Sequence, residues 1–210
     1  MVNTHWHFDH ADGNEWLNSQ GAVIVAHENT RKHLGEATRV DDWNFNFPPS
    51  PTGALPSELV STEKKMEING SAVIVKYYGP SHTDGDVWVR LDDTDIIHTG
   101  DTYWNGFFPF IDHSTGGSID GTIKAAEATI QAASDDTIII PGHGPVGGKK
   151  ELVAYYDMLR SIREKVAALK SKGHSLEQVL AANVTESVDA RWAAFAVKAN
   201  TFIKLVYVGV

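Results

Sequence analysis

Four side chains that can bind a metal ion stand within six residues near the start of the chain. Residues 4–10 read THWHFDH and offer three imidazoles and one carboxylate. Alternate side chains of an extended backbone share a face, so His5, His7 and Asp9 would point the same way. A turn at Asp9 would then bring His10 round to meet a second ion. A lone histidine is usually a surface or core residue, but this clustering predicts a metal site.

Three further segments each place a single histidine or aspartate among turn residues at the end of a predicted strand. They are His82 in GPSHTDG, Asp101 in TGDT and His143 in PGHGP. Strand ends are where functional sites are usually assembled. Together with the first cluster, these segments supply a nitrogen and oxygen ligand set that suits zinc, or iron or manganese if the pocket favours them.

The hydrophobic pattern predicts the elements that must position these residues. Short runs rich in Val, Ile and aromatic residues predict strands, whereas apolar positions with a 3.6-residue period predict helices. The predicted strands cover 22–26, 66–69, 71–78, 87–91, 95–98 and 137–140. The predicted helices cover 12–19, 28–34, 118–133 and 151–170, and segments 175–182 and 201–207 complete the chain. Residues 36–58 contain four prolines and read as a long irregular loop, a kind of segment that is usually functional or mobile.

Composition bounds the class of protein. A chain of 210 residues suits one domain spanning residues 1–210. Its 18 basic and 27 acidic residues give a net charge of −9, which argues against a nucleic-acid partner and favours a small-molecule substrate. No apolar stretch approaches the roughly 20 residues that cross a membrane, so we do not expect the chain to interact with a membrane. The absence of cysteine excludes disulfides, thiolate ligands and a cysteine nucleophile.

With these motifs in order, the sequence resembles the metallo-β-lactamase superfamily. That superfamily has the pattern His-x-His-x-Asp-His, then a lone His, a lone Asp or Cys, and a final His. The resemblance implies an α+β fold, the αβ/βα four-layer sandwich of the metallo-β-lactamase type. It also implies that several strands preceding the first motif in full members are absent here, so that the fold is N-terminally incomplete.

The resemblance also implies a division of labour among the seven residues. His5, His7 and His82 would bind one metal, Asp9, His10 and His143 a second, and Asp101 would bridge two zinc ions. A bridging water would lose a proton near neutral pH, and the resulting hydroxide would attack a polarised carbonyl. Asp9 is the expected catalytic residue, orienting this nucleophile or relaying its proton.

The residue types near position 101 point to a branch of the superfamily. Asp101 resembles hydrolases such as glyoxalase II and the lactonases, whereas the largest subclass of zinc β-lactamases has Cys there and Lys three residues later. In this chain Trp104 occupies that later position. Tyr103 stands one residue from where lactonases place a substrate-contacting Tyr. We therefore expect Tyr103, Trp104 and Trp43 to contact a lactone, ester, thioester or lactam, with a partly apolar pocket wall. The alternative is that the aromatic residues around Trp43 and Trp104 only fill the core.

Two alternatives remain open at this point. The superfamily also contains iron-dependent oxidoreductases, such as persulfide dioxygenases, and the chain could be an inactive metal-binding fragment. The missing strands would leave an apolar sheet face and an unpaired edge, which predicts a homo-oligomer, a dimer or larger. No charged segment followed by an apolar one marks a signal peptide, so we expect a soluble protein of the cytoplasm, or of the periplasm if the start is truncated.

Overall fold

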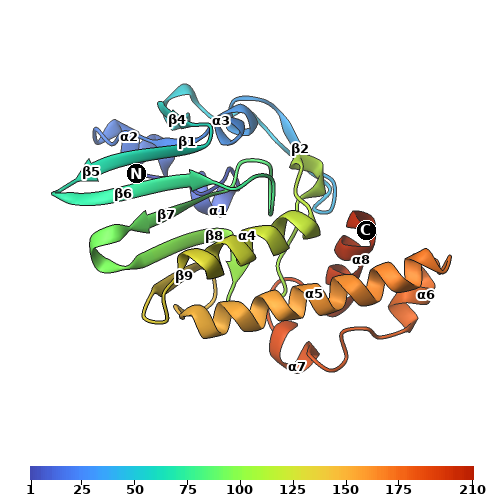
Figure 1. Ribbon diagram of the computed structural model, residues 1–210. Helices are drawn as coiled ribbons and strands as arrows, with labels where there is room; N and C mark the ends of the chain where they lie inside the picture. Colours follow the sequence, from blue (N-terminus) through green and yellow to red (C-terminus); the bar gives the residue numbers. More distant parts are fainter.

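A five-stranded sheet is the centre of the computed structural model, which describes residues 1–210 (Figure 1). Its strand order is β5-β6-β7-β8-β9, and neighbours are antiparallel except β8 and β9, which are parallel. The strands are β5 (Glu63–Ile68), β6 (Ser71–Tyr77), β7 (Val87–Leu91), β8 (Ile96–Trp104) and β9 (Ile138–His143). The predicted meander is thus confirmed, although β8 runs six residues past its predicted end.

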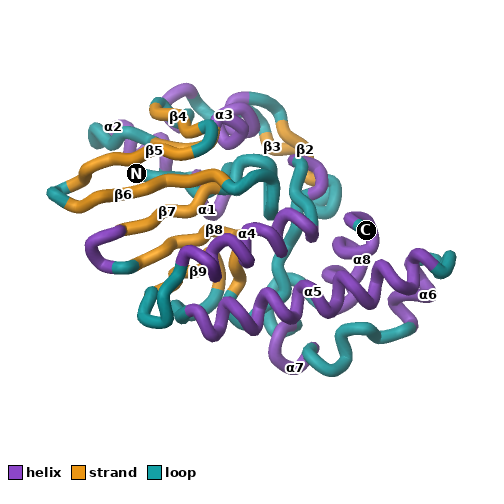
Figure 2. The backbone as a smooth tube through the Cα atoms, in the orientation of Figure 1, coloured by secondary structure: helices purple, strands orange, loops and turns teal.

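Helices cover one face of this sheet and form the larger core with it. They are α4 (Ile119–Ala132), α5 (Lys149–Ser171) and α8 (Ala199–Gly209), with the short α6 (Leu176–Ala181) and α7 (Asp189–Trp192) beside them (Figure 2). Ser118 caps α4 by accepting a hydrogen bond from the Gly121 backbone N–H at 3.0 Å. Ile119 on α4, Leu159 on α5 and Phe202 on α8 are fully buried in this core, as the apolar periodicity predicts.

The opposite face carries a second, smaller sheet. Strands β1 (Val25–His27) and β4 (Glu58–Val60) pair in parallel, and Val2 forms a bridge to Val25. Val25, Val60, Val75 and Val87 pack between the two sheets. Helices α1 (Phe8–Ala11), α2 (Asn14–Ser19) and α3 (Glu28–Gly35) lie on this side of the molecule (Figure 1). The layers therefore follow the predicted αβ/βα order.

The segment expected to be an irregular loop contains regular structure. Residues 36–58 include the antiparallel hairpin of β2 (Thr38–Val40) and β3 (Phe45–Phe47). Asn44 adopts a positive φ of 50° before β3, a conformation that asparagine tolerates better than most residues. The 3₁₀ turns of the chain are at Thr52–Ala54, Asp92–Thr94 and His113–Thr115. None of the helices has the length and hydropathy needed to span a lipid bilayer.

Candidate metal centre

The seven predicted ligands converge at one edge of the sheets, although they come from five parts of the chain. His5 and His7 precede α1, which carries Asp9 and His10. His82 lies in the β6–β7 loop, Asp101 on β8 and His143 at the end of β9. The parallel β8–β9 ladder brings its two residues together, because it pairs Gly100 with Pro141 and Trp104 with His143.

The backbone around Asp9 differs from the extended conformation that the sequence suggested. His7 is the N-terminal cap residue of α1, so the chain turns before Asp9 rather than at it. Asp9 therefore does not share a face with His5 and His7. It groups instead with His10 and His143, while His5 and His7 group with His82. His5 and His10 also form a third group with Asp101, which joins the two clusters.

The first cluster consists of His5, His7 and His82. All three side chains are at most 2% exposed, and one ring nitrogen of each lies within 4.8 Å of the others. His82 Nε2 lies 3.0 Å from His7 Nδ1. Three imidazole nitrogens that face one another in a buried space match the ligand chemistry of zinc.

Each histidine of this cluster uses its other ring nitrogen in a hydrogen bond outside the cluster. His5 Nδ1 lies 3.2 Å from Thr4 Oγ1, and His7 Nε2 lies 3.1 Å from Asp112 Oδ2. His82 Nδ1 lies 2.7 Å from the backbone oxygen of Phe110, to which it can donate. Such partners fix the ring orientation and the tautomer, as they do in metal sites.

The second cluster consists of Asp9, His10 and His143, and it is more open to solvent. Asp9 Oδ2 lies 3.3 Å from His10 Nε2 and 3.3 Å from His143 Nε2. The side chains of Asp9 and His143 are 36% and 23% exposed. This cluster therefore faces the side from which a substrate can enter.

Asp101 lies between the two clusters. Its Oδ1 is 3.1 Å from His10 Nε2, and its Oδ2 is 3.2 Å from His143 Nε2. The same Oδ2 is 3.6 Å from His82 Nε2 and 4.0 Å from His5 Nε2. A single carboxylate, 3% exposed, thus contacts both clusters, as a bridging ligand must.

Burial and neighbouring side chains shift the pKa values of the histidines and of Asp101 in the two clusters. Burial lowers the pKa of His5 well below its ordinary value and that of His82 to about 4, which keeps both rings neutral. Burial acts in the same direction on His10 and His143, but hydrogen bonds to Asp101 and Asp9 outweigh it and raise their pKa values to about 10 and about 9. Burial would raise the pKa of Asp101, yet the surrounding histidines hold it well below its usual range.

The donor set fits a pair of metal ions by a further criterion. His5 Nε2 is a buried polar atom without a hydrogen-bond partner in the protein, and Asp101 Oδ2 lies 4.0 Å from it. An unpaired buried polar atom is costly, and a bound cation would satisfy it. Gly142 leaves room for the bridging carboxylate, because a Cβ atom there would lie 1.9 Å from Asp101 Oδ1. The fit supports metal binding by this chain.

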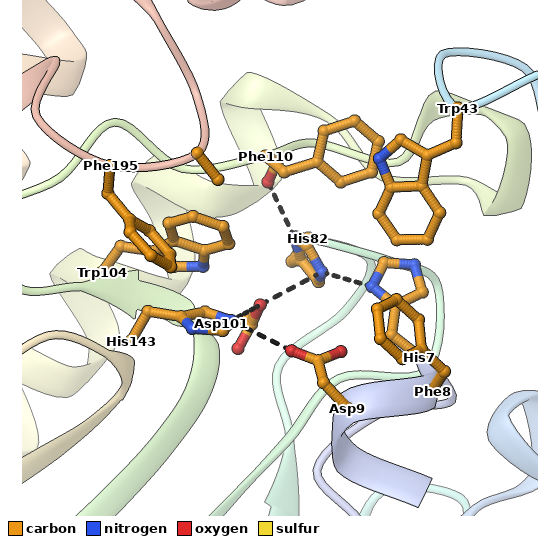
Figure 3. A pocket seen from close by; sticks show the side chains of 11 residues that line it. His7, Phe8, Asp9, Trp43, His82, Asp101, Trp104, Phe110, His143 and Phe195 are labelled. Atoms are coloured by element: carbon orange, nitrogen blue, oxygen red, sulfur yellow. Dashed lines mark hydrogen bonds and ion pairs between the residues drawn. The ribbon is translucent and has the colours of Figure 1, made fainter. Parts of the chain in front are cut away.

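A cavity of about 190 Å³ opens over the two clusters (Figure 3). Its floor includes His7, His82, Asp101 and His143, and its walls are mostly aromatic. The wall residues are Phe8, Trp43, Trp104, Phe110, Phe195 and Ala196. Trp43 stacks on Phe110 with 4.9 Å between ring centroids, and Trp104 lies 4.2 Å from the His143 ring.

A second cavity, of about 360 Å³, continues from the first. The two share Trp43, Trp104, Phe110 and Ala196, and Val197 and Thr201 extend the lining toward α8. Lys204 on α8 lies 2.6 Å from Asp42, next to Trp43, so an ion pair ties α8 to the β2–β3 turn at this cavity. The space next to the clusters therefore suits a substrate with an apolar portion.

Two of the three residues predicted to contact substrate line the cavity, and the third does not. Trp43 and Trp104 line the cavity, but Tyr103 does not. Successive side chains of a strand point to opposite faces, and Tyr103 points into the helical core, where it is fully buried and packs on Tyr155 with 5.0 Å between ring centroids. The prediction that Tyr103 contacts substrate is therefore wrong, because the side chain lies in the core and not at the cavity.

Two contributions were missed or undervalued from the sequence. Phe195 and Ala196 line the cavity from a segment far along the chain, and no local pattern marks them. Asp112 accepts a hydrogen bond from the Ser114 backbone N–H at 3.0 Å and another from His7, which orients a ring of the first cluster. The remaining histidines lie outside the clusters; His33, for example, pairs with Asp84 at 2.9 Å.

Comparisons with known proteins identify a family for most of the chain. Residues 1–143 match the family model described as the metallo-beta-lactamase superfamily. The probable metallo-hydrolase YqgX of Bacillus subtilis (strain 168) is 22% identical over 143 residues, which cover 68% of this chain and 66% of that protein. The chain thus spans about two thirds of the length of this relative.

Solved structures resemble the chain in fold. A metallo-beta-lactamase from Pontibacter korlensis superposes with a TM-score of 0.58 at 22% identity, covering 76% of this chain and 67% of that one. The inverting sec-alkylsulfatase Pisa1 from Pseudomonas sp. gives a TM-score of 0.67 at 17% identity, covering 98% of this chain and 40% of that one. The C-terminal helices thus also have a counterpart in a solved structure.

Proposed function

This chain belongs to the metallo-beta-lactamase superfamily, and from that premise we propose that it is a dinuclear zinc hydrolase acting on a carbonyl substrate. The substrate classes are lactones, esters, thioesters and lactams. The observation that carries the proposal is the position of Asp101, whose carboxylate lies within 4.0 Å of histidine nitrogens from both clusters. A carboxylate shared in this way could bridge two ions in one site.

In this proposal each side chain has a defined role. His5, His7 and His82 hold one ion, Asp9, His10 and His143 hold the other, and Asp101 bridges them. When bound, the two ions supply a water of lowered pKa and Lewis-acid polarisation of the carbonyl. The outer partners Thr4 and Asp112 and the Phe110 carbonyl orient the three buried rings.

Asp9 is the proposed proton acceptor. Its Oδ2 contacts His10 and His143, while its side chain is 36% exposed at the cavity floor. The second carboxylate oxygen is therefore available to accept a hydrogen bond from the attacking water and to pass its proton to the leaving group. Burial opposes ionisation of this carboxyl, but hydrogen bonds to His10 and His143 outweigh it and hold its pKa well below the ordinary value, so the group is an anion that can accept a hydrogen bond.

The cavity walls support an uncharged or weakly polar substrate body. Trp43, Phe110 and Trp104 carry no charge, and the one cation of the second cavity, Lys204, is paired with Asp42. No unpaired lysine or arginine is therefore offered to a substrate carboxylate, which favours esters, thioesters and lactones over penicillin-like lactams.

The proposal is tested with a substrate panel on zinc-loaded protein. The panel contains lactams, lactones, thioesters, aryl esters and phosphodiesters. A secondary alkyl sulfate is added because the sec-alkylsulfatase is similar over 98% of this chain. Turnover of a carbonyl compound by wild type, lost in His7→Ala, supports the proposal. Turnover that survives His7→Ala would reject the metal mechanism.

Metal analysis separates this function from an oxidoreductase of the same superfamily. The proposal expects about two zinc ions per chain and no oxygen consumption. Protein purified with iron that consumes oxygen in the presence of a persulfide would contradict it.

We also propose that the chain self-associates. Trp16, Val23 and Leu59 are 67%, 53% and 44% exposed and lie in or beside α2 and the small sheet. Exposed apolar side chains of this size favour an interface between copies. Light scattering after size-exclusion chromatography should give at least twice the mass of one chain, and a monodisperse monomer would contradict the proposal.

A further inference from the structure

Trp104 presents a hydrogen-bond donor that nothing in the protein uses. The side chain is 5% exposed, and its Nε1 is buried without an acceptor. It lines both the cavity over the metal clusters and the adjoining one. An indole N–H is only a donor and keeps its proton throughout the physiological pH range, so any partner that it finds in the cavity is an acceptor.

The ring of Trp104 is held with this donor toward the site. Figure 3 shows the indole nitrogen on the ring edge that faces the cavity, on the side of His82 and Asp101. The ring lies 4.2 Å from the His143 ring and 6.0 Å from that of Phe195, and the backbone of Trp104 pairs with that of His143. These contacts fix the donor before substrate arrives.

Few other wall residues can perform this role. Phe8, Phe110, Phe195 and Ala196 have no side-chain donor. A carbonyl oxygen that enters between these apolar walls leaves its hydrogen bonds to water behind. An N–H group already in place would replace one of these lost hydrogen bonds. The bond would be strongest in the transition state, when negative charge accumulates on the carbonyl oxygen.

We infer that Trp104 is a catalytic residue whose indole N–H donates a hydrogen bond to the carbonyl oxygen of the substrate. As the water oxygen bonds to the carbonyl carbon, the π electron pair moves onto that oxygen, and the attacking water gives a proton to Asp9. When the tetrahedral species collapses, the leaving group departs with its bonding pair and takes up that proton. The N–H stabilises the oxyanion between these two events. The inference rests on the proposed hydrolytic function.

Trp88 provides a matched control for the donor. It is 6% exposed, and its Nε1 is also buried without a partner, but it packs on Tyr78 and lines neither cavity. Replacement by phenylalanine removes a buried N–H and reduces the ring at both positions. Any general effect of that change on the fold should therefore appear in both variants, whereas an effect on the reaction should appear only at position 104.

The kinetic test compares Trp104→Phe and Trp88→Phe on an ester that wild type hydrolyses. For Trp104→Phe, kcat should fall about 100- to 1,000-fold with little change in KM, because loss of one oxyanion donor acts mainly on the transition state. Trp88→Phe should stay within about twofold of wild type. A Trp104→Phe protein that folds, binds the same metal content and keeps the wild-type kcat would overturn the inference.

A second readout does not depend on turnover. In zinc-loaded protein labelled with ¹⁵N-tryptophan, the signal missing from Trp104→Phe identifies the Trp104 indole N–H. Titration with benzoate, a carboxylate product analogue, should move that signal downfield and leave the Trp88 signal in place. A Trp104 signal that stays fixed while benzoate saturates the site would overturn the inference. If wild type hydrolyses no substrate, the proposed function fails, yet this titration still decides whether Trp104 donates to an oxyanion.

Discussion

The carboxylate of Asp112 accepts a hydrogen bond from His7, with 3.1 Å between Nε2 and Oδ2. Asp112 is 1% exposed and is itself fixed by the Thr115 hydroxyl, which donates to the same oxygen at 2.6 Å. The bond assigns the His7 proton to Nε2 and leaves Nδ1 free to face His82. One residue outside the ligand set thereby determines which nitrogen of His7 is offered to a metal.

Asp112→Asn should therefore weaken metal binding without removing a ligand. The neutral amide cannot hold the His7 tautomer as firmly, and the loss of such partners typically lowers metal affinity about 10- to 100-fold. Competition with a chromophoric chelator measures this directly. The control is Asp84→Asn, because Asp84 bonds His33 at 2.9 Å in the same manner but outside the clusters. Equal affinity for wild type and Asp112→Asn would show that the bond has no role in metal binding.

The metal-free protein should be most stable near pH 6.5. Burial lowers the pKa of His82 to about 4, so below 6.5 the unfolded chain takes up a proton that the folded chain refuses, and stability falls. Burial opposes a raised pKa at His10 and His143, but Asp101 and Asp9 raise them to about 10 and about 9. Their contribution is complete below 6.5 and is lost as the pH rises through those values.

Urea unfolding of chelator-treated protein at pH 5, 6.5, 8 and 9.5 measures this profile. The zinc-loaded protein should lack the decline above pH 6.5, because metal binding has already displaced the protons of His10 and His143. Stability of the metal-free protein that increases steadily from pH 6.5 to 9.5 would contradict the assigned charges.

The ion pair between Lys204 and Asp42 should influence substrate binding rather than chemistry. It ties α8 to the turn that carries Trp43, and an exposed pair of this kind contributes about 0.2–1 kcal/mol. Lys204→Met should therefore raise KM by up to about fivefold for substrates with an apolar portion and leave kcat unchanged. Lys64→Met is the control, since Lys64 contacts Glu58 at the same 2.6 Å distance, remote from the cavity. A fall in kcat with KM constant would argue against this role.

Removing the Tyr103 hydroxyl should leave the enzyme active. The hydroxyl is buried in the helical core without a hydrogen-bond partner, so Tyr103→Phe removes an unsatisfied polar group. Both kcat and KM should match wild type, and thermal unfolding should occur at the same or a higher temperature. A loss of activity greater than about tenfold in a variant that unfolds at the wild-type temperature would restore Tyr103 to the site.

The candidate ligands could be selected from the sequence because residue types and their spacing are local properties. The motif at residues 4–10, and the single His82, Asp101 and His143 at strand ends, required only the expectation that strand ends meet. The helix at Phe8–Ala11 was not expected, since four residues give no periodicity to read. The candidate ligands nevertheless lie close together, because their grouping depends on the final positions of the side chains more than on where the chain turns.

The walls of the cavity could be predicted only in part. Trp43 and Trp104 were expected as wall residues, yet Tyr103 was placed beside them although adjacent strand residues point to opposite faces. Phe195 reaches the site from a segment about 50 residues beyond His143, so its approach depends on how α5 to α8 pack. The β2–β3 hairpin was hidden by neighbouring prolines and by a turn that depends on the positive φ of Asn44.

Anomalous diffraction at the zinc absorption edge tests the central claim most directly. Crystals of the zinc-loaded protein should show two peaks in each chain, one among His5, His7 and His82 and the other among Asp9, His10 and His143, with Asp101 between them. In crystals of Asp101→Asn the occupancy of at least one peak should fall. A single peak in the wild-type protein, or two peaks of which one lies outside these clusters, would contradict the dinuclear site.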